Sequence, residues 1–351
     1  MKNIFNFLYS TRLTAILFIL FATAMGIATF IENDFGTQTS KALVYNAWWF
    51  EAIMVFFVIN FFGNIKRYQL YKKEKWATLI MHLSWIFIIV GAFVTRYISY
   101  EGMMPIREGA VSNTVYSDMP YLTTFVDGEY MGEMKRKTME NQLLLSQATN
   151  NSFQISNKFS DIPYKIELQE FIMNASETFN PDAKGKLYIK LVEAIAGSRK
   201  EHFLLEGEVK NISNVLFAFN KFTQGAINIT KAAENYTIQT PFDGNFMRMA
   251  DKMQGTITKD KTSELMFRSL YNAGGSQFVF PELAQKGEVV LASNNDYKDK
   301  KTDDAIVVKV TSQNKEEILT LMGSKGKQGE PKSIKIGKLD FTLMYGSKVH
   351  T

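Results

Sequence analysis

The chain contains no cysteine, and this absence excludes several classes of site at once. Disulfide frameworks, cysteine-based zinc sites, thioredoxin-type redox chemistry and a CxxCH haem-attachment motif of the chain's own all require cysteine. Histidine is almost as scarce, since the 351 residues include only three, His82, His202 and His350. A metal site built on two histidines of this chain would have to join distant segments of the sequence.

The common catalytic and phosphate-binding motifs are also missing. The sequence has no P-loop, no GxGxxG after a predicted strand, no HExxH and no GxSxG. The glycine-spaced segment 323–330 (GSKGKQGE) has no helix after it, so we interpret it as a hairpin loop between strands. The net charge of +5 does not indicate nucleic-acid binding, because the lysines are spread among acids and form no aromatic-basic face. In a membrane protein, an excess of basic over acidic residues more often reflects the topology and contact with anionic membrane lipid.

Apolar residues are concentrated near the N-terminus, although the mean hydropathy of the whole chain is only −0.11. Three apolar runs predict transmembrane helices at about 13–31, 45–65 and 76–96. The first run is too long for the core of a signal peptide and lacks a clear A-x-A cleavage site, so we expect a retained helix. We therefore predict a multi-pass membrane protein whose transmembrane region covers residues 1–97.

The charges of the short loops predict how these helices cross the membrane. The loop between the second and third runs carries Lys66, Arg67, Lys72, Lys73 and Lys75 against the single acid Glu74. By the positive-inside rule, this loop and the N-terminus lie in the cytoplasm, and the chain after about Thr95 is extracytoplasmic. Trp48 and Trp49 are then expected as interfacial anchors. Glu51 is expected close to an interface, as a snorkelling acid more often than a functional one.

The remaining residues, 98–351, predict a β-rich extracytoplasmic domain without internal repeats. Alternating or β-branched segments separated by turn clusters indicate strands at 164–173, 186–194, 226–230, 236–240, 287–293, 305–312 and 338–346. We expect a short helix around 250–270, and a loop or a weak strand over 135–151. The last strand is expected to lack a neighbour, which would make the domain only marginally stable.

His82 is the most informative residue of the chain. It lies inside the run from Trp76 to Val94, which has about 19 residues and no Asp, Glu, Lys or Arg. At ~1.5 Å per residue, it is roughly 9 Å from the cytoplasmic end of the span. Ionisable side chains at membrane depth are costly and usually carry function, and an imidazole there can relay protons, pair with a polar neighbour or hold a haem iron. From the residues alone, a packing role and a role as a ligand are about equally supported.

A haem iron held by His82 would need a second axial ligand for six-coordination. Neither His202 nor His350 lies in a predicted span, so this ligand must come from another chain, a second copy or a further part of the same polypeptide. Both of these histidines have polar neighbours and are expected to be exposed. We expect the tryptophans to lie at the membrane interface or to pack between helices. The alternative is that one of them faces a bound haem, and Trp85 is the candidate.

Several segments around these residues resemble one protein family. They are GIATFIE (26–32), YNAWWFE (45–51), NFFGNIKRYQLY (60–71), MHLSWIFIIVGAFVTRY (81–97) and YEGMMPIREG followed by SN at 112–113. This pattern resembles the ResB/CcsB family, the membrane components of System II cytochrome c biogenesis. The resemblance is specific over about residues 11–115 and mainly architectural over the rest. It corresponds to the CcsB portion of CcsBA-type fusions.

The resemblance implies a subunit in the bacterial inner membrane that works with a CcsA-type WWD-domain protein. Together the two would export haem b, held non-covalently, and attach it to apocytochrome c. In the family a histidine of the corresponding span is a proposed haem ligand near the cytoplasmic entry, and this role carries over to His82. The chain would then be a non-catalytic or accessory subunit of a haem lyase complex.

Two departures from the family pattern qualify this expectation. The family normally has a fourth span after the exported domain, which is not found here, so the chain is expected to be a fragment or one half of a split fusion. The WWD segment is also absent, so the chain alone should not be a complete haem lyase. The alternatives are a membrane-anchored extracytoplasmic scaffold or sensor without haem, and a b-type electron carrier.

Overall fold

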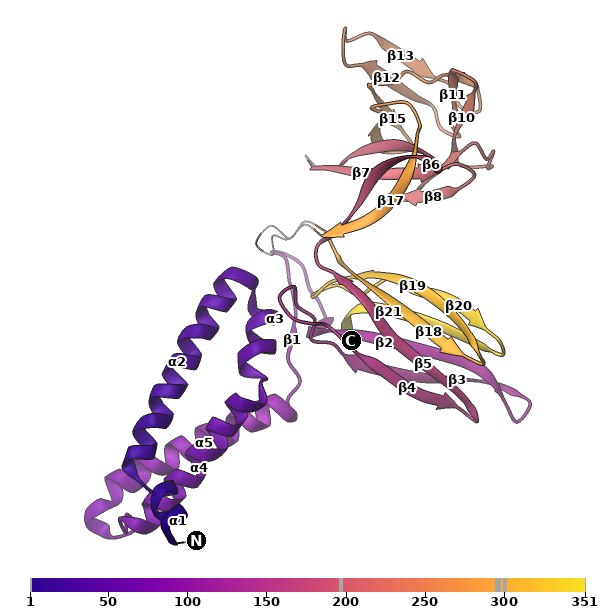
Figure 1. The fold of residues 1–351 in the computed structure, drawn as a ribbon. Helices are drawn as coiled ribbons and strands as arrows, with labels where there is room; N and C mark the ends of the chain where they lie inside the picture. Colours follow the sequence, from indigo (N-terminus) through magenta and orange to yellow (C-terminus); the bar gives the residue numbers. More distant parts are fainter. Residues whose placement is uncertain (1, 196–197, 294–297, 299–301, 351) are drawn as a thin grey trace. The chain divides into compact units, whose positions relative to one another are not determined.

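The chain forms two compact units (Figure 1). The computed structural model describes residues 2–195, 198–293, 298 and 302–350. Unit 1 comprises residues 1–175 and 293–351, and unit 2 comprises residues 176–292. Unit 2 is therefore inserted into the sequence of unit 1.

Unit 1 begins with helices, three of which are long and apolar enough to cross a membrane. In chain order the helical elements are α1 (Lys2–Leu8), α2 (Thr11–Phe35), α3 (Thr37–Ser40), η1 (Lys41–Tyr45), α4 (Trp48–Arg67), η2 (Lys73–Lys75) and α5 (Trp76–Tyr97). Ser10 caps α2, because its side-chain oxygen accepts from the amide of Leu13. Gly36 ends α2 in a conformation with φ of 82°. The helices α2, α4 and α5 confirm the three predicted spans.

The three long helices are covered to different degrees by the rest of the chain. A shared apolar cluster joins them through Leu13, Leu17, Phe57, Phe61 and Ile86. The buried share of the apolar window is 33% for α4 and 17% for α2 but only 6% for the segment that contains α5. The helix that carries His82 therefore has most of its surface open to lipid or to a partner.

Two antiparallel sheets complete unit 1 and enclose one apolar core. One sheet has the order β1-β2-β21-β20, with β3 also paired to β2, and the other has the order β19-β18-β5-β4. Their bounds are β1 Gly102–Met103, β2 Val115–Tyr130, β3 Glu133–Gln142, β4 Gln154–Phe159, β5 Ile162–Ile172, β18 Asp304–Ser312, β19 Lys315–Gly323, β20 Lys332–Ile336 and β21 Leu339–His350. Alternation places Val126 of β2 and Val308 of β18 in the core, both fully buried.

Unit 2 contains two further sheets around its own core of aromatic and branched side chains. The sheet orders are β14-β11-β10-β9-β8 and β13-β12-β15-β16-β6-β17, with β7 paired to β6. The bounds are β6 Ala175–Ile195, β7 Ser198–Leu205, β8 Val209–Ile212, β9 Val215–Phe219, β10 Ile227–Ala232, β11 Asn235–Gln239, β12 Gly244–Arg248, β13 Gln254–Ile257, β14 Ser263–Glu264, β15 Ser269–Ala273, β16 Ser276–Val279 and β17 Gln285–Ser293. The chain enters unit 2 along β6 and leaves it along β17.

The β-rich prediction is confirmed, with two corrections. The expected helix at 250–270 is wrong: the segment contains β13, β14 and the start of β15, joined by tight turns in which Lys252, Asp260 and Arg268 adopt positive φ values. The last strand does not lack a neighbour, because β21 pairs with both β2 and β20. The segment 135–151 is strand β3 as far as Gln142, and the rest is loop.

The glycine-spaced segment 323–330 is the connection between β19 and β20, as predicted. Close packing requires glycine at two of its positions, since a Cβ on Gly323 or on Gly329 would lie within 2 Å of the backbone oxygen of Tyr345 in β21. The loop is also bonded to that strand, because the amide of Ser347 donates to the carbonyl of Lys327 at 2.8 Å. The connection is thus packed on β21 and not free in solvent.

Candidate functional site

His82 lies within the third long helix, two turns after its first residue, with a half-buried ring. Its Nδ1 is 2.9 Å from the backbone oxygen of Thr78. A carbonyl oxygen can only accept, so Nδ1 carries a hydrogen, and in the neutral imidazole Nε2 is then the nitrogen with the lone pair. Within the described ranges Nε2 has no hydrogen-bond partner. This is the tautomer that binds a metal through Nε2, with the other ring nitrogen fixed by a backbone carbonyl.

An aromatic cluster lies beside this imidazole. The ring of Phe61 in α4 contacts the His82 ring edge-on, with the centroids 5.5 Å apart. Trp85 stacks on the same Phe61 ring at 6.4 Å and meets Phe18 of α2 edge-on at 5.4 Å. His82 and Trp85 are three residues apart on one helix face, and the structure brings both against Phe61.

A cavity of about 1050 Å³ extends from this cluster along the helices of unit 1. Apolar side chains such as Phe21, Phe57 and Phe93 line most of it, and Trp85 is part of the wall. His82 is not a lining residue. The other end of the cavity is polar, with Lys41, Glu51, Arg96, Asp118 and Tyr121 among the side chains there. The volume is that of a site for a large organic ligand, for which ~300–1,000 Å³ is usual.

Glu51 and Arg96 form an ion pair at the polar end. The hydroxyl of Tyr97 also donates to Glu51, and the Arg96 guanidinium donates to the carbonyls of Tyr45 at 2.8 Å and Asn46 at 3.0 Å. The first turn of α4 is therefore bonded to the last turn of α5. Glu51 is a partner in helix packing there. The partner of Glu51 could not be predicted from the sequence, because Glu51 and Arg96 belong to different apolar runs.

Asp118 of β2 binds two lysines at the same end. Its carboxylate lies 3.2 Å from the Nζ of Lys41 in η1 and 2.5 Å from the Nζ of Lys325 in the loop after β19. The carboxylate is largely covered, with 16% of the side chain exposed. This triad joins the helical part of unit 1 to its sheets.

The pKa of Asp118 predicts how this contact responds to acid. Burial would raise the pKa, but hydrogen bonds from Lys325 and Lys41 outweigh burial, so the pKa is below its ordinary value. A carboxyl with a lowered folded-state pKa contributes stability that is complete above the unfolded value, about 4, and is lost as the pH falls through the folded value. We expect the stability difference between wild type and Asp118→Asn to be constant from pH 5 to 8 and to shrink below about pH 4. Thermal unfolding of both proteins across this range measures it, and a difference that grows in acid would contradict the assignment.

A polar network lies between α2 and α4 inside the helical region. Asn60 and Asn64, four residues apart, are almost fully buried. Thr14 donates to the Oδ1 of Asn60 at 2.6 Å, and Asn60 donates to the carbonyl of Leu8 at 2.7 Å. Asn64 donates to Asn60 at 2.9 Å. Sequence reasoning missed this network, although two amides four residues apart in an apolar run are a signal that could have identified it.

The other two histidines do not join His82. The expected exposure of His202 is wrong, since only 8% of it is exposed and its Nε2 lies 3.4 Å from Glu193 in unit 2. Burial lowers the pKa of His202, as do Lys200 and Lys210, against the opposing effect of Glu193. His350 is exposed, as predicted, and its ring is 4.7 Å from that of Tyr100.

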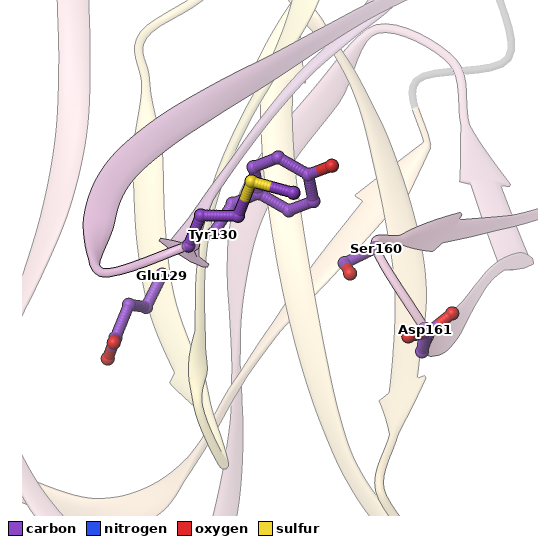
Figure 2. A pocket seen from close by; sticks show the side chains of 5 residues that line it. Glu129, Tyr130, Ser160 and Asp161 are labelled. Atoms are coloured by element: carbon purple, nitrogen blue, oxygen red, sulfur yellow. The ribbon is translucent and has the colours of Figure 1, made fainter.

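A second hollow, of about 550 Å³, lies between the β2–β3 and β4–β5 turns. Glu129, Tyr130, Met131, Ser160 and Asp161 line it. Figure 2 shows the carboxylate of Glu129 pointing away from Ser160 and Asp161, so the acids do not converge on one point. Among the residues that the structure describes, no group of three or more His, Asp or Glu side chains could hold a metal ion.

Comparison with known proteins gives one partial similarity of note. Protein NrfI of Wolinella succinogenes is 40% identical to this chain over 119 residues. The similar stretch is 34% of this chain and 13% of NrfI, so the chain matches only a small part of that relative. No protein-family model matches the chain.

Proposed function

We propose that this protein takes part in cytochrome c maturation as the ResB/CcsB-like subunit of a complex that exports haem and attaches it to apocytochrome c. The partial similarity to Protein NrfI supports a role in cytochrome c biogenesis. The quoted motifs of residues 11–115 support the finer assignment to a ResB/CcsB-like subunit. In this proposal haem b is cargo, bound without a covalent bond and passed on.

The observation that carries the proposal is the Nε2 of His82. It is a lone-pair nitrogen at membrane depth, its tautomer is fixed by the Thr78 carbonyl, and it has no partner within the described ranges. The surroundings of the imidazole are apolar and aromatic, since the buried ring of Phe61 contacts it and Trp85, which also lines the cavity, packs on Phe61. The chain supplies one axial ligand there, so we propose that a CcsA-type WWD-domain partner supplies the second.

The same assignment proposes a location and a division of labour. In this proposal His82 lies toward the cytoplasmic face of the bacterial inner membrane and the sheets of unit 1 lie outside it, which the positive charge of the loop at 66–75 supports. The cavity lined by Trp85 leads from the His82 end of the bundle toward Asp118. This subunit would receive and hold haem as an accessory component, and the partner would carry out attachment to apocytochrome c.

Replacing His82 tests the proposal. In a complex purified with a CcsA-type protein, His82→Ala should lose most of the b-type haem, because the iron loses an axial ligand, while assembly is unchanged. Haem content is read from the pyridine haemochrome spectrum, and cytochrome c maturation should fall in parallel. Added imidazole should restore haem to a His82→Gly variant, which a purely structural role would not explain. His350→Ala, at an exposed histidine, is the matched control.

Each alternative gives a different result. Full haem content and normal maturation in His82→Ala would make His82 a packing residue and refute the proposal. A wild-type complex without haem would favour a scaffold or sensor. Reversible reduction of the bound haem by a quinol, without any maturation defect in the variant, would favour a b-type electron carrier.

A further inference from the structure

The segment after the third long helix, residues 98–111, exposes an unusual number of apolar side chains. The large apolar residues exposed there are Ile98 (72%), Tyr100 (48%), Met103 (42%), Met104 (43%), Ile106 (54%) and Val111 (98%). Single exposed apolar residues are ordinary on a soluble surface, but several within one short segment indicate a surface that another phase or molecule covers.

The segment has a defined backbone. Gly102 and Met103 form β1 and pair with β2, and the amide of Asp118 donates to the carbonyl of Glu101 at 2.9 Å. Beyond β1 the chain turns back, because the amide of Ala110 donates to the carbonyl of Arg107 at 2.9 Å. The loop 104–111 is therefore held at its base by the sheet, while Met104, Ile106 and Val111 are 43%, 54% and 98% exposed.

The base of this loop is at the end of the membrane-spanning helices. Residue 98 directly follows α5, and Asp118, next to β1, binds Lys41 between α3 and α4. The ion pair of Glu51 with Arg96 places the first turn of α4 at this same end. That first turn exposes Trp48 by 79%, as expected for a side chain in the interfacial layer.

We propose that the loop 104–111 is a membrane-surface anchor, with Met104, Ile106 and Val111 inserted into the boundary between lipid headgroups and acyl chains. The partner is the bilayer itself, because the loop continues directly from a spanning helix and is tied to the end of the bundle. Charge does not drive the contact, since Arg107 is the only cation among residues 98–111 and the acids Glu101 and Glu108 outnumber it. Insertion should therefore not require anionic lipid.

The absence of cysteine makes a direct test available. Single cysteines at Ile106 and at Val111 are labelled with an environment-sensitive fluorophore in the full chain, reconstituted into phosphatidylcholine nanodiscs. Met131 is the matched control: it is an exposed apolar side chain (85%) at the turn after β2. At ~3.3 Å per residue, it is roughly 40 Å along the strand from Asp118.

We expect lipid-borne doxyl groups to quench the probes at 106 and 111 about threefold or more strongly than the probe at 131, and aqueous iodide to quench them correspondingly less. The same result should hold when phosphatidylglycerol is added. Equal iodide quenching at 106, 111 and 131 would overturn the proposal. Protection from iodide without lipid quenching would also overturn it, because it would indicate that protein and not lipid covers the loop.

Discussion

Replacing Gly329 with valine is expected to destabilise unit 1 by about 3 kcal/mol. A Cβ at this position would lie 1.9 Å from the backbone oxygen and 2.7 Å from the carbonyl carbon of Tyr345. These atoms belong to β21, which pairs with strands on both sides, so they cannot move aside as a flexible side chain would. The loop 323–330 must therefore leave the sheet or distort it.

Thermal unfolding of the full chain in detergent measures this effect. Gln328→Ala is the matched control, because Gln328 is the exposed neighbour of Gly329 and should change stability by no more than about 0.5 kcal/mol. If Gly329→Val unfolds at the same temperature as Gln328→Ala, the loop does not pack on β21.

Replacing Asn60 with leucine is expected to weaken the helical bundle by about 2 kcal/mol, although leucine is similar in size and suits a membrane. Asn60 exchanges hydrogen bonds with Thr14, Asn64 and the carbonyls of Leu8 and Ser10, at 2.6 to 3.2 Å. Three of these bonds leave α4, and since hydrogen bonds between membrane helices average about 0.6 kcal/mol, the three together give about this total. The loss removes the bonds of α4 to Leu8 and Ser10, and leaves the longer bond of Asn64 to Thr14, at 3.2 Å, as the remaining part of the network between α2 and α4.

Unfolding of the full chain in mixed micelles of increasing SDS content measures the loss. Phe62→Leu is the control: Phe62 lies two residues away on α4 and is 55% exposed, so its replacement should be nearly neutral. Equal stability of the two variants would mean that the Asn60 network does not hold α2 against α4.

The sequence predicted the elements whose signal is local. The spans at 13–31, 45–65 and 76–96 correspond to α2, α4 and α5, because length and apolarity alone define a membrane helix. Residues 305–312 were predicted as a strand because alternating apolar side chains face one core, and β18 covers Asp304–Ser312. Strand β3 gave a weak signal, since its sequence EMKRKTMENQ is polar on an exposed strand.

Features that depend on pairing between distant segments were not predictable. The bond between Asp118 and Lys41 joins residues 77 positions apart. The burial of His202 was missed for another reason: β7 pairs with the preceding strand β6, which brings Glu193 beside His202, whereas the polar neighbours of His202 in sequence suggested exposure. For His82 the sequence indicated an ionisable residue at membrane depth, which is a kind of residue that usually carries function. The bond of His82 to the Thr78 carbonyl and its contact with Phe61 depend on the side-chain rotamer and on the packing of α5 against α4, which the sequence does not specify.

The insertion of unit 2 into the sequence of unit 1 also has a consequence for biosynthesis. Strand β2 pairs with β21, and Val115 is matched to His350, which follows the whole of unit 2 in the sequence. During synthesis, β2 must therefore remain without this partner until β21 has been made, while the strands of unit 2 find most of theirs locally. Contacts between distant residues form slowly, and unpaired strands aggregate while they wait. Unit 1 thus completes its folding last, and a holding chaperone would have its longest opportunity to act on β2.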